Sequence, residues 1–280
     1  MEKKKLSIPA LAEMKRQGRK IKMVTAYDYP TALLVDQSPM DLILVGDSLG
    51  MVVLGYESTV PVTMDEMVHH TKAVTRAARN TFVVADLPFL SYQVTVEEAV
   101  RNSGRLMKEA GADAVKLEGG AVVAGTVRAV VSAGIPVMGH LGLTPQTATM
   151  LGGLKVQARD AEAAKMLILD ARLLEEAGAF SIVLEAIPAQ LAEMVSRNVS
   201  IPTVGIGAGP DCDGQVLVIH DMLGLFQRFT PKFVKRYAAL GEQVAAALAS
   251  YCQEVDGRQF PAPEHTFNMK PDELSRLVEG

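Results

Sequence analysis

The 280-residue chain has few cysteines, no tryptophan and no excess of basic charge. Its two cysteines, Cys212 and Cys252, are too few for a disulfide framework or a cysteine-based zinc site, and they suit a reducing compartment. The 28 basic and 32 acidic residues give a net charge of −4, without the basic excess typical of nucleic-acid binding. We therefore expect no nucleic-acid partner.

The chain also lacks an apolar run long enough to span a membrane. Residues 1–18 start with basic residues but contain no apolar segment typical of a signal peptide. The longest uncharged stretch, residues 129–154, is interrupted by Pro136, Pro145 and several Gly, Thr and Gln residues. We predict a cytoplasmic protein that does not associate with a membrane.

What the chain does contain is a repeated pattern of short apolar runs followed by amphipathic stretches. The runs are continuously apolar, which is typical of parallel strands covered on both faces. They span residues 21–27, 41–47, 81–87, 113–118, 135–140, 180–185, 201–207 and 215–221. Eight strands alternating with helices predict an α/β fold, a single-domain (β/α)8 TIM barrel over residues 1–280. An open doubly wound sheet is the alternative architecture.

Helix boundaries add detail to this prediction. We expect a short amino-terminal helix at about residues 7–18 and a polar carboxyl-terminal tail at about 256–280. Threonines mark further helix starts, either three residues before a glutamate, as in a capping box, or directly before a proline. The pairs are Thr63 with Glu66, Thr95 with Glu98, Thr144 with Pro145 and Thr230 with Pro231.

The active site of a parallel α/β fold lies at the carboxyl ends of its strands. The polar residues there are Asp47, Ser48, Asp86, Lys116, Glu118, His140, Glu185 and Asp221. Several carboxylates in one pocket repel one another, and a divalent cation removes that repulsion. All candidate ligands are oxygen donors and no His or Cys pair has zinc spacing, so the pattern predicts Mg²⁺ or Mn²⁺.

The acidic residues each leave alternatives open. Asp47 and Asp86 are metal ligands or caps of the helices that follow them. Glu118 is a ligand, holds a metal-bound water, or caps the turn at residues 119–120. Glu185 is a further ligand or, failing that, the best candidate for a general base.

The remaining polar residues also allow two interpretations each. Lys116 lies two positions before Glu118 and shares its strand face, so it binds a substrate carboxylate or pairs with Glu118. His140 belongs to the site or is a buried histidine bonded to its neighbours. The segment Gly205-Ile-Gly-Ala-Gly209 lacks the third glycine of a dinucleotide fingerprint because residue 210 is proline. It forms a loop that a ligand approaches closely, or an ordinary tight turn.

Several segments in fixed order resemble the ketopantoate hydroxymethyltransferase family over about residues 21–230. They are Val24-Thr-Ala-Tyr-Asp28, Gly46-Asp-Ser-Leu-Gly50, Ala85-Asp-Leu-Pro-Phe89, Val115-Lys-Leu-Glu-Gly119, Gly139-His-Leu-Gly-Leu-Thr-Pro-Gln146, the segment 205–209 and Asp213-Gly-Gln-Val-Leu-Val218. The resemblance implies a barrel of the phosphoenolpyruvate mutase and isocitrate lyase superfamily. It also implies a homo-oligomer, often a decamer.

The activity that this resemblance implies is the first step of pantothenate biosynthesis. A one-carbon unit passes from 5,10-methylenetetrahydrofolate, a co-substrate, to 3-methyl-2-oxobutanoate and gives 2-dehydropantoate (ketopantoate). Matched positions imply that Asp47 and Asp86 bind Mg²⁺ and that Glu118 is a further acid of the metal site. They also imply that Glu185 accepts the proton. The groups implied to bind the keto acid are Asp47, Ser48, Asp86, Lys116 and His140.

Two positions depart from the family pattern, and two other functions compete with the one implied. The family more often has an aromatic residue at 154 and glycine at 158, where this chain has Leu154 and Ala158. One competing function is a Mg²⁺-dependent lyase of the same superfamily, which typically uses a cysteine-bearing loop as its acid. The other is a non-catalytic barrel that binds a metabolite or serves in an assembly, although such a barrel has no need for acids at its strand ends.

Overall fold

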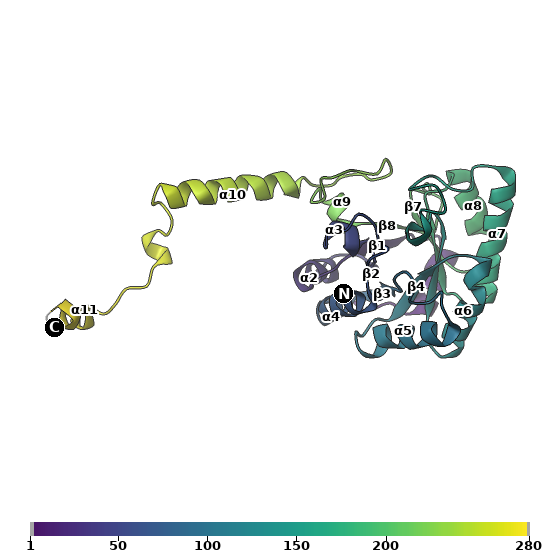
Figure 1. Cartoon of the computed structure of the whole chain (residues 1–280), viewed down its shortest axis with the longest axis horizontal. Coiled ribbons are helices and arrows are strands. Elements are labelled where there is room, and N and C mark those ends of the chain that lie inside the picture. The colour runs from purple at the N-terminus through teal and green to yellow at the C-terminus, as the bar shows by residue number, and fades with distance from the viewer. Residues whose placement is uncertain (1–2, 279–280) are drawn as a thin grey trace.

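The computed structural model describes residues 3–278; the predicted domain range also includes residues 1–2 and 279–280, which lie outside the described residues. Eight parallel strands pair in sequence order, and β8 closes the barrel against β1, with Ile21 opposite Gly214 (Figure 1). The strands are β1 (Ile21–Thr25), β2 (Leu42–Val45), β3 (Phe82–Asp86), β4 (Ala114–Glu118), β5 (Val137–Gly142), β6 (Ser181–Glu185), β7 (Thr203–Ile206) and β8 (Gly214–Leu217). The predicted TIM barrel is confirmed, and the open sheet is excluded.

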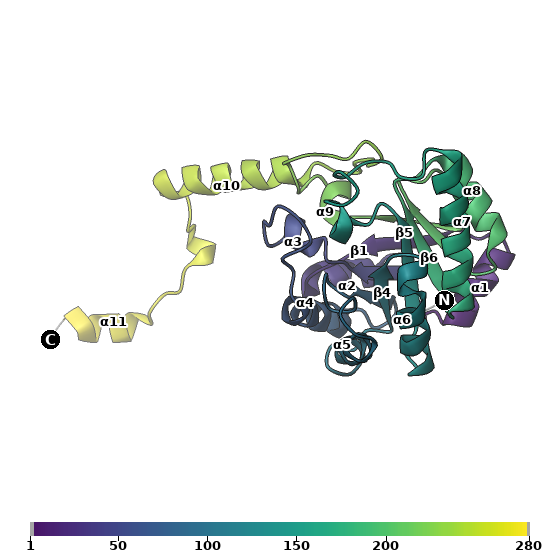
Figure 2. The ribbon, with the colours of Figure 1, turned by 45° about the vertical axis from the view of Figure 1, so that its right-hand side comes forward.

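Helices cover the outside of the strands (Figure 2). The helices of the described residues are α1 (Ile8–Arg16), α2 (Tyr29–Gln37), α3 (Leu49–Val52), α4 (Met64–Ala77), α5 (Val96–Lys108), α6 (Ala121–Ser132), α7 (Ala161–Glu176), α8 (Ala189–Asn198), α9 (Ile219–Met222), α10 (Leu240–Asp256) and α11 (Pro271–Val278), with 3₁₀ turns at Pro145–Thr147 and Pro263–His265. Helices α10 and α11 lie away from the barrel and do not cover its strands (Figure 1, Figure 2). The Thr63 and Glu66 side chains form the complete capping box predicted for α4. Thr95 caps α5 in one direction only, by accepting a hydrogen bond from the Glu98 amide.

Three sequence-based expectations about the last third of the barrel are wrong. The eighth apolar run does not stay extended to residue 221, because β8 ends at Leu217 and α9 begins at Ile219. No helix begins at Thr230–Pro231 in the described chain, where one was expected, and the next helix starts only at Leu240. Strands and helices also fail to alternate between β7 and β8, which a short loop connects directly. Glycines and a proline fill that loop, so it has no helix-forming run.

The barrel has two apolar layers. Outward-facing aliphatic side chains of the strands pack against the helices and form the larger core. A second cluster fills the barrel interior at the amino-terminal ends of the strands, where Leu11 and Met14 of α1 pack with Phe82, Met138 and Phe180. Helix α1 therefore closes this end of the barrel, and the opposite end remains available for a ligand.

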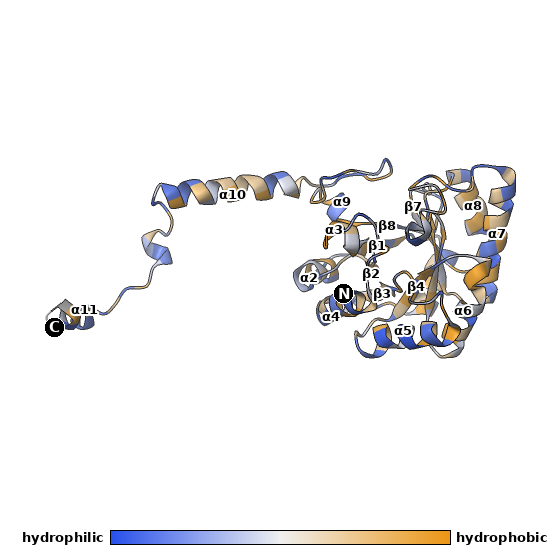
Figure 3. Cartoon of the chain, in the orientation of Figure 1, coloured by the Kyte–Doolittle hydropathy of each residue, from blue (hydrophilic) through white to orange (hydrophobic). Residues whose placement is uncertain are grey.

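After α9 the chain leaves the barrel as an arm (Figure 1). The arm includes α10, which begins before the tail expected at about residue 256, and none of its residues is buried. Hydrophobic and hydrophilic residues are nevertheless interspersed along α10 (Figure 3). Its exposed large side chains include Val244, Leu248 and Tyr251. No helix within residues 3–278 combines the length and the apolar character that a membrane crossing requires.

Candidate active site

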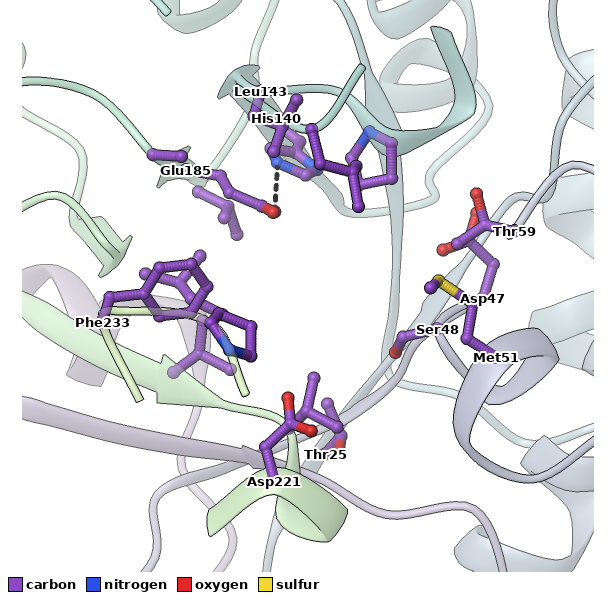
Figure 4. A pocket seen from close by; sticks show the side chains of 18 of the residues that line it. Thr25, Asp47, Ser48, Met51, Thr59, His140, Leu143, Glu185, Asp221 and Phe233 are labelled. Carbon is purple, nitrogen blue, oxygen red and sulfur yellow. Dashed lines mark ion pairs between the residues drawn. The ribbon is translucent and has the colours of Figure 1, made fainter. Parts of the chain in front are cut away.

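Inward-facing positions at the carboxyl ends of the strands build one cavity of about 610 Å³. Strand side chains alternate between the two faces of a sheet, so every second residue of a barrel strand points inward. The structure brings all the predicted site residues together in this cavity: Asp47, Ser48, Asp86, Lys116, Glu118, His140 and Glu185. Figure 4 shows four of them, Asp47, Ser48, His140 and Glu185, around the open space. Asp221, which the sequence also placed at a strand end, lines the same cavity.

Lys116 lies at the centre of the buried charges and pairs with Asp86. Its Nζ is 3.1 Å from Asp86 Oδ1, and each side chain retains only 4% of its exposure. The alternative in which Lys116 pairs with Glu118 is not the arrangement seen, although Glu118 contributes to the field around it. Burial lowers the pKa of Lys116, but the carboxylates of Asp86, Glu118 and Asp47 outweigh that effect and raise it. Lys116 is therefore a fixed positive charge at the base of the cavity.

The carboxylates around Lys116 outnumber the cations available to them. Burial, followed by the neighbouring Asp86, raises the pKa of Asp47 to about 7. Burial and Asp47 likewise raise the pKa of Glu118 well above its ordinary value. Asp86 Oδ1 has no well-aligned hydrogen bond within the described residues, despite its ion-pair distance to Lys116. This acid cluster therefore has more negative charge than the protein balances.

A divalent cation fits this cluster. The donors are carboxylate oxygens, which suit Mg²⁺, and a cation would restore the ionised forms of Asp47 and Glu118. Within residues 3–278, no three His, Cys, Asp or Glu side chains are gathered closely enough to bind a metal by themselves. A cation here would take few ligands from the protein and keep the other positions for substrate or water.

His140 joins Lys116 to Glu185. Lys116 Nζ lies 3.2 Å from His140 Nδ1, and because an ammonium group has no acceptor, Nδ1 accepts the hydrogen bond. Burial and Lys116 lower the pKa of His140, so the ring is neutral and has its proton on Nε2. Nε2 faces Glu185 Oε2 at 3.1 Å, although the alignment falls short of a full hydrogen bond (Figure 4). His140 thus orients Glu185, whose side chain is 16% exposed and points into the cavity.

Two residues that the sequence analysis left without a role support the acids. Gln146 donates from Nε2 to Asp47 Oδ2 at 2.8 Å and from its backbone amide to Glu118 Oε2 at 3.1 Å. Tyr92 donates to Gln146 Oε1 at 2.7 Å and accepts from the Glu118 amide at 3.1 Å. Gln146 closes one of the quoted segments, but it lies beyond a strand end, so a search of strand ends misses it.

The outer part of the cavity has a different, mainly apolar wall. Leu154 and Val156 line it from one loop, and Phe226, Phe229 and Phe233 line it from the segment after α9. Gly207 lies directly beneath Phe233, because a Cβ at Gly207 would be 2.7 Å from the ring. The glycine segment 205–209 is therefore closely approached by this aromatic side chain of the chain itself. Leu154 is one of the two departures from the family pattern. The other, Ala158, does not line the cavity and has a φ of 52°, a conformation that favours glycine.

Comparison with known proteins places the chain in a family. Residues 5–263 match the ketopantoate hydroxymethyltransferase family. The chain is 61% identical to the 3-methyl-2-oxobutanoate hydroxymethyltransferase of Heliobacterium modesticaldum, over 98% of this chain and 99% of the relative. It is 62% identical to the enzyme of that name from Moorella thermoacetica, over 95% and 99% of the two chains.

Solved structures support the same fold at much lower identity. A phosphonopyruvate hydrolase crystallised with oxalate and Mg²⁺ is 15% identical, with a TM-score of 0.60 over 97% of both chains. A 2,3-dimethylmalate lyase of the phosphoenolpyruvate mutase/isocitrate lyase superfamily is 17% identical, with a TM-score of 0.59 over 99% of this chain and 95% of the lyase. The chain belongs to the ketopantoate hydroxymethyltransferase family and is a one-carbon transferase acting on 3-methyl-2-oxobutanoate.

Proposed function

We propose that the enzyme uses Mg²⁺ and transfers the one-carbon unit of 5,10-methylenetetrahydrofolate to carbon 3 of 3-methyl-2-oxobutanoate. Together with one water, the reaction gives 2-dehydropantoate and tetrahydrofolate, the first step of pantothenate biosynthesis. The observation that carries this proposal is the excess of buried carboxylate at the cavity base, beside one lysine and a histidine-oriented glutamate.

Asp47 and Asp86 would hold the metal, with Glu118 as a further acid of the site. Bound Mg²⁺ would polarise the 2-oxo group of the substrate and make the proton on carbon 3 more acidic. Lys116 would attract the substrate carboxylate and fix its orientation. Ser48, whose Oγ lies 2.8 Å from the Tyr27 hydroxyl, would complete the contacts to the keto acid with His140.

Glu185 would take the proton from carbon 3. Its carboxylate points into the cavity, and the neutral His140 beside it holds that orientation without supplying a positive charge. The resulting carbanion forms a carbon–carbon bond to the methylene carbon of the folate. Both carbon–nitrogen bonds of that carbon break in the overall reaction, water supplies the hydroxyl group, and the two folate nitrogens end protonated. The base therefore has to lie near both substrates, and Glu185 lines the cavity that we propose for them.

The two cysteines support this transferase over a lyase. Cys212 is buried close to Gly205, and Cys252 is exposed on α10. Neither lines the cavity, so neither is placed to act as the acid of a carbon–carbon lyase. Both are free thiols, which supports the proposed cytoplasmic location.

We also propose that the enzyme is a homo-oligomer, with the decamer as the expected size. The arm supports this, because α10 exposes Val244, Leu248, Tyr251 and Val255 without burying any residue of its own. An exposed apolar helix of this length is usually covered in a stable protein.

Proton NMR of 3-methyl-2-oxobutanoate in D₂O tests the proposed function. With enzyme and Mg²⁺, the carbon-3 proton signal should disappear, and a chelator should prevent the loss. Ketopantoate should appear only when 5,10-methylenetetrahydrofolate is added. Exchange without product in the presence of folate would reject the folate donor. Exchange that the chelator does not affect would reject the metal.

A further inference from the structure

The cavity is much larger than a small keto acid requires. A volume of about 610 Å³ lies within the roughly 300–1,000 Å³ typical of pockets for drug-sized ligands. The residues assigned to the keto acid occupy only its base. The outer part, with its aromatic wall, therefore has no ligand assigned to it, and the larger of the two substrates has no assigned contacts.

Asp221 is the one acid of the cavity that the mechanism does not use. It lies on α9 with 8% of its surface exposed, and its carboxylate points into the open space across from His140 (Figure 4). Within the described residues, no hydrogen-bond donor and no ion-pair partner contacts this carboxylate. Burial raises the pKa of Asp221 to about 6 while Arg236 opposes the effect, so the group is mostly ionised at neutral pH. The carboxylate oxygens of Asp221 thus face the cavity without a donor from the described residues (Figure 4), and a ligand that supplies donors would satisfy both of them.

The side chains around Asp221 indicate the shape and the charge of a ligand that would bind there. Phe226 and Phe229 pack edge to face with ring centroids 5.6 Å apart, and Phe233 lies over Gly207. These rings offer an apolar wall for a flat heterocycle. At the entrance, Lys155 and Lys232 line the cavity but remain exposed, so the rim is positive where the interior offers a carboxylate.

We propose that the outer cavity binds the reduced pterin of the one-carbon donor, with Asp221 accepting hydrogen bonds from its amino-pyrimidine edge and Lys155 and Lys232 attracting its glutamate tail. This assignment rests on the proposed use of a folate donor. A pterin presents an N3–H and a 2-amino group side by side, which matches the two oxygens of one carboxylate. The tail carries carboxylates and extends from the opposite end of the molecule, as the two lysines at the rim require.

Asp221→Asn tests the central contact, because asparagine keeps the shape but turns one acceptor into a donor. We expect the Kd of tetrahydrofolate, measured by calorimetry, to rise about ten- to hundredfold. The Mg²⁺-dependent exchange of the carbon-3 proton of the keto acid should stay at the wild-type rate. Asp211→Asn, the same change on the exposed β7–β8 loop, is the matched control and should change neither quantity.

A change on the ligand gives a second test, and its first part uses the wild-type protein alone. A tetrahydrofolate analogue without the 2-amino group should bind the wild-type protein about as weakly as tetrahydrofolate binds Asp221→Asn. The analogue should lose little further affinity in that variant, because both changes remove the same contact. Unchanged tetrahydrofolate binding by Asp221→Asn, or additive losses in this pair, would overturn the pterin assignment.

The folate tail provides the test of the rim. Lys232→Gln should weaken binding of a tetrahydrofolate triglutamate several-fold and leave binding of a tetrahydropterin without a tail unchanged. Equal effects on both ligands would remove Lys232 from the subsite. Failure of the wild-type enzyme to transfer carbon from 5,10-methylenetetrahydrofolate is a different result, because it rejects the proposed function itself and the subsite with it.

Discussion

Both ends of the barrel contain buried or half-buried carboxylates, and the two groups differ in how their charge is balanced. At the amino-terminal end, Asp36 accepts hydrogen bonds from the Thr81 hydroxyl and from the amide and side chain of Asn80. Asp213, at the same end, pairs with Lys15 at 2.9 Å and accepts from the Thr203 amide. These acids are supplied with donors by the protein itself.

At the carboxyl-terminal end the balance is reversed. Hydrogen bonds lower the pKa of Asp36 against the effect of burial, whereas burial and neighbouring acids raise the pKa of Asp47 to about 7. Lys116 is the cation within reach, and it serves several carboxylates at once. An acid that stabilises the fold has its donors in place, and an acid that lacks them is arranged for a ligand.

The interior residues of single strands show the same contrast. On β3 the inward positions change from Phe82 and Val84 to Asp86, and on β4 from Ala114 to Lys116 and Glu118. The apolar layer provides stability and the polar layer provides the site, within one strand. Variants at the two ends should therefore change different properties.

The largest effect is expected at the carboxyl-terminal end, from Glu185→Gln. Loss of a general base should lower kcat by about 10²- to 10⁴-fold, because the amide cannot take the proton from carbon 3. Binding of the keto acid with Mg²⁺ should remain within a few-fold of the wild-type value. Steady-state kinetics and calorimetry check the two halves, and normal turnover would remove Glu185 as the base.

At the amino-terminal end, Leu11→Ala should affect stability instead. Leu11 of α1 is 1% exposed, and truncating such a side chain costs about 2–5 kcal/mol of unfolding free energy. Urea unfolding measures the loss, and kcat should be unchanged at a temperature where the variant is folded. Leu34→Ala, at a position that is 69% exposed, is the matched control with an expected change below about 0.5 kcal/mol. A kcat that falls with Leu11 would contradict the separation of the two ends.

Asp36→Asn tests whether the charge of an acid at the amino-terminal end contributes to stability, because that contribution should depend on pH. Because the folded pKa of Asp36 is lowered, its contribution is present above the unfolded pKa of about 3.9 and is lost as the pH falls through the folded value. The variant should be about 1–3 kcal/mol less stable at pH 7. The difference from wild type should shrink in unfolding experiments below about pH 4. A difference that does not depend on pH would show that packing, rather than charge, is responsible.

The smallest effect is expected from Ala158→Gly in the loop beside the cavity. Ala158 has a φ of 52°, which costs a residue with a Cβ roughly 1–2 kcal/mol and costs glycine little. The greater freedom of glycine in the unfolded chain offsets about 0.5–1 kcal/mol of that gain. Thermal unfolding should therefore show a net stabilisation of between zero and about 1.5 kcal/mol. A less stable variant would mean that packing of the Ala158 methyl group stabilises the fold by more free energy than the strained backbone conformation costs.

The barrel and the polar residues that line its cavity could be predicted because both depend on local pattern. Apolar runs mark each strand, and the residue that ends a strand is known once the strand is placed, so Asp86, Lys116 and Glu185 could all be identified. The predicted end of the eighth strand was wrong because Val218 and Ile219, at the start of α9, are apolar residues that also suit a strand. The direct loop between β7 and β8 could not be predicted. The strand–helix alternation of the rest of the chain leads to the expectation of a helix between every pair of strands, including this one.

The partners within the site could not be predicted. Lys116 shares a strand face with Glu118 yet pairs with Asp86, because strands β3 and β4 lie side by side with these two residues in register. Gln146 donates a hydrogen bond to Asp47, although the two residues are 99 positions apart in the sequence. Such contacts between distant residues form only when the sheet closes into a barrel. The local pattern of a single sequence does not indicate them.

Calorimetric titration of metal-free enzyme with Mg²⁺, in the presence of 3-methyl-2-oxobutanoate, tests the central claim most directly. The claim is that the unbalanced acids at the carboxyl-terminal end are arranged for a cation. Wild-type enzyme should bind one Mg²⁺ per chain, Asp86→Asn should bind none in the same range, and Asp36→Asn should bind as the wild type does. Absence of Mg²⁺ binding by the wild type, or unchanged binding by Asp86→Asn, would contradict the account.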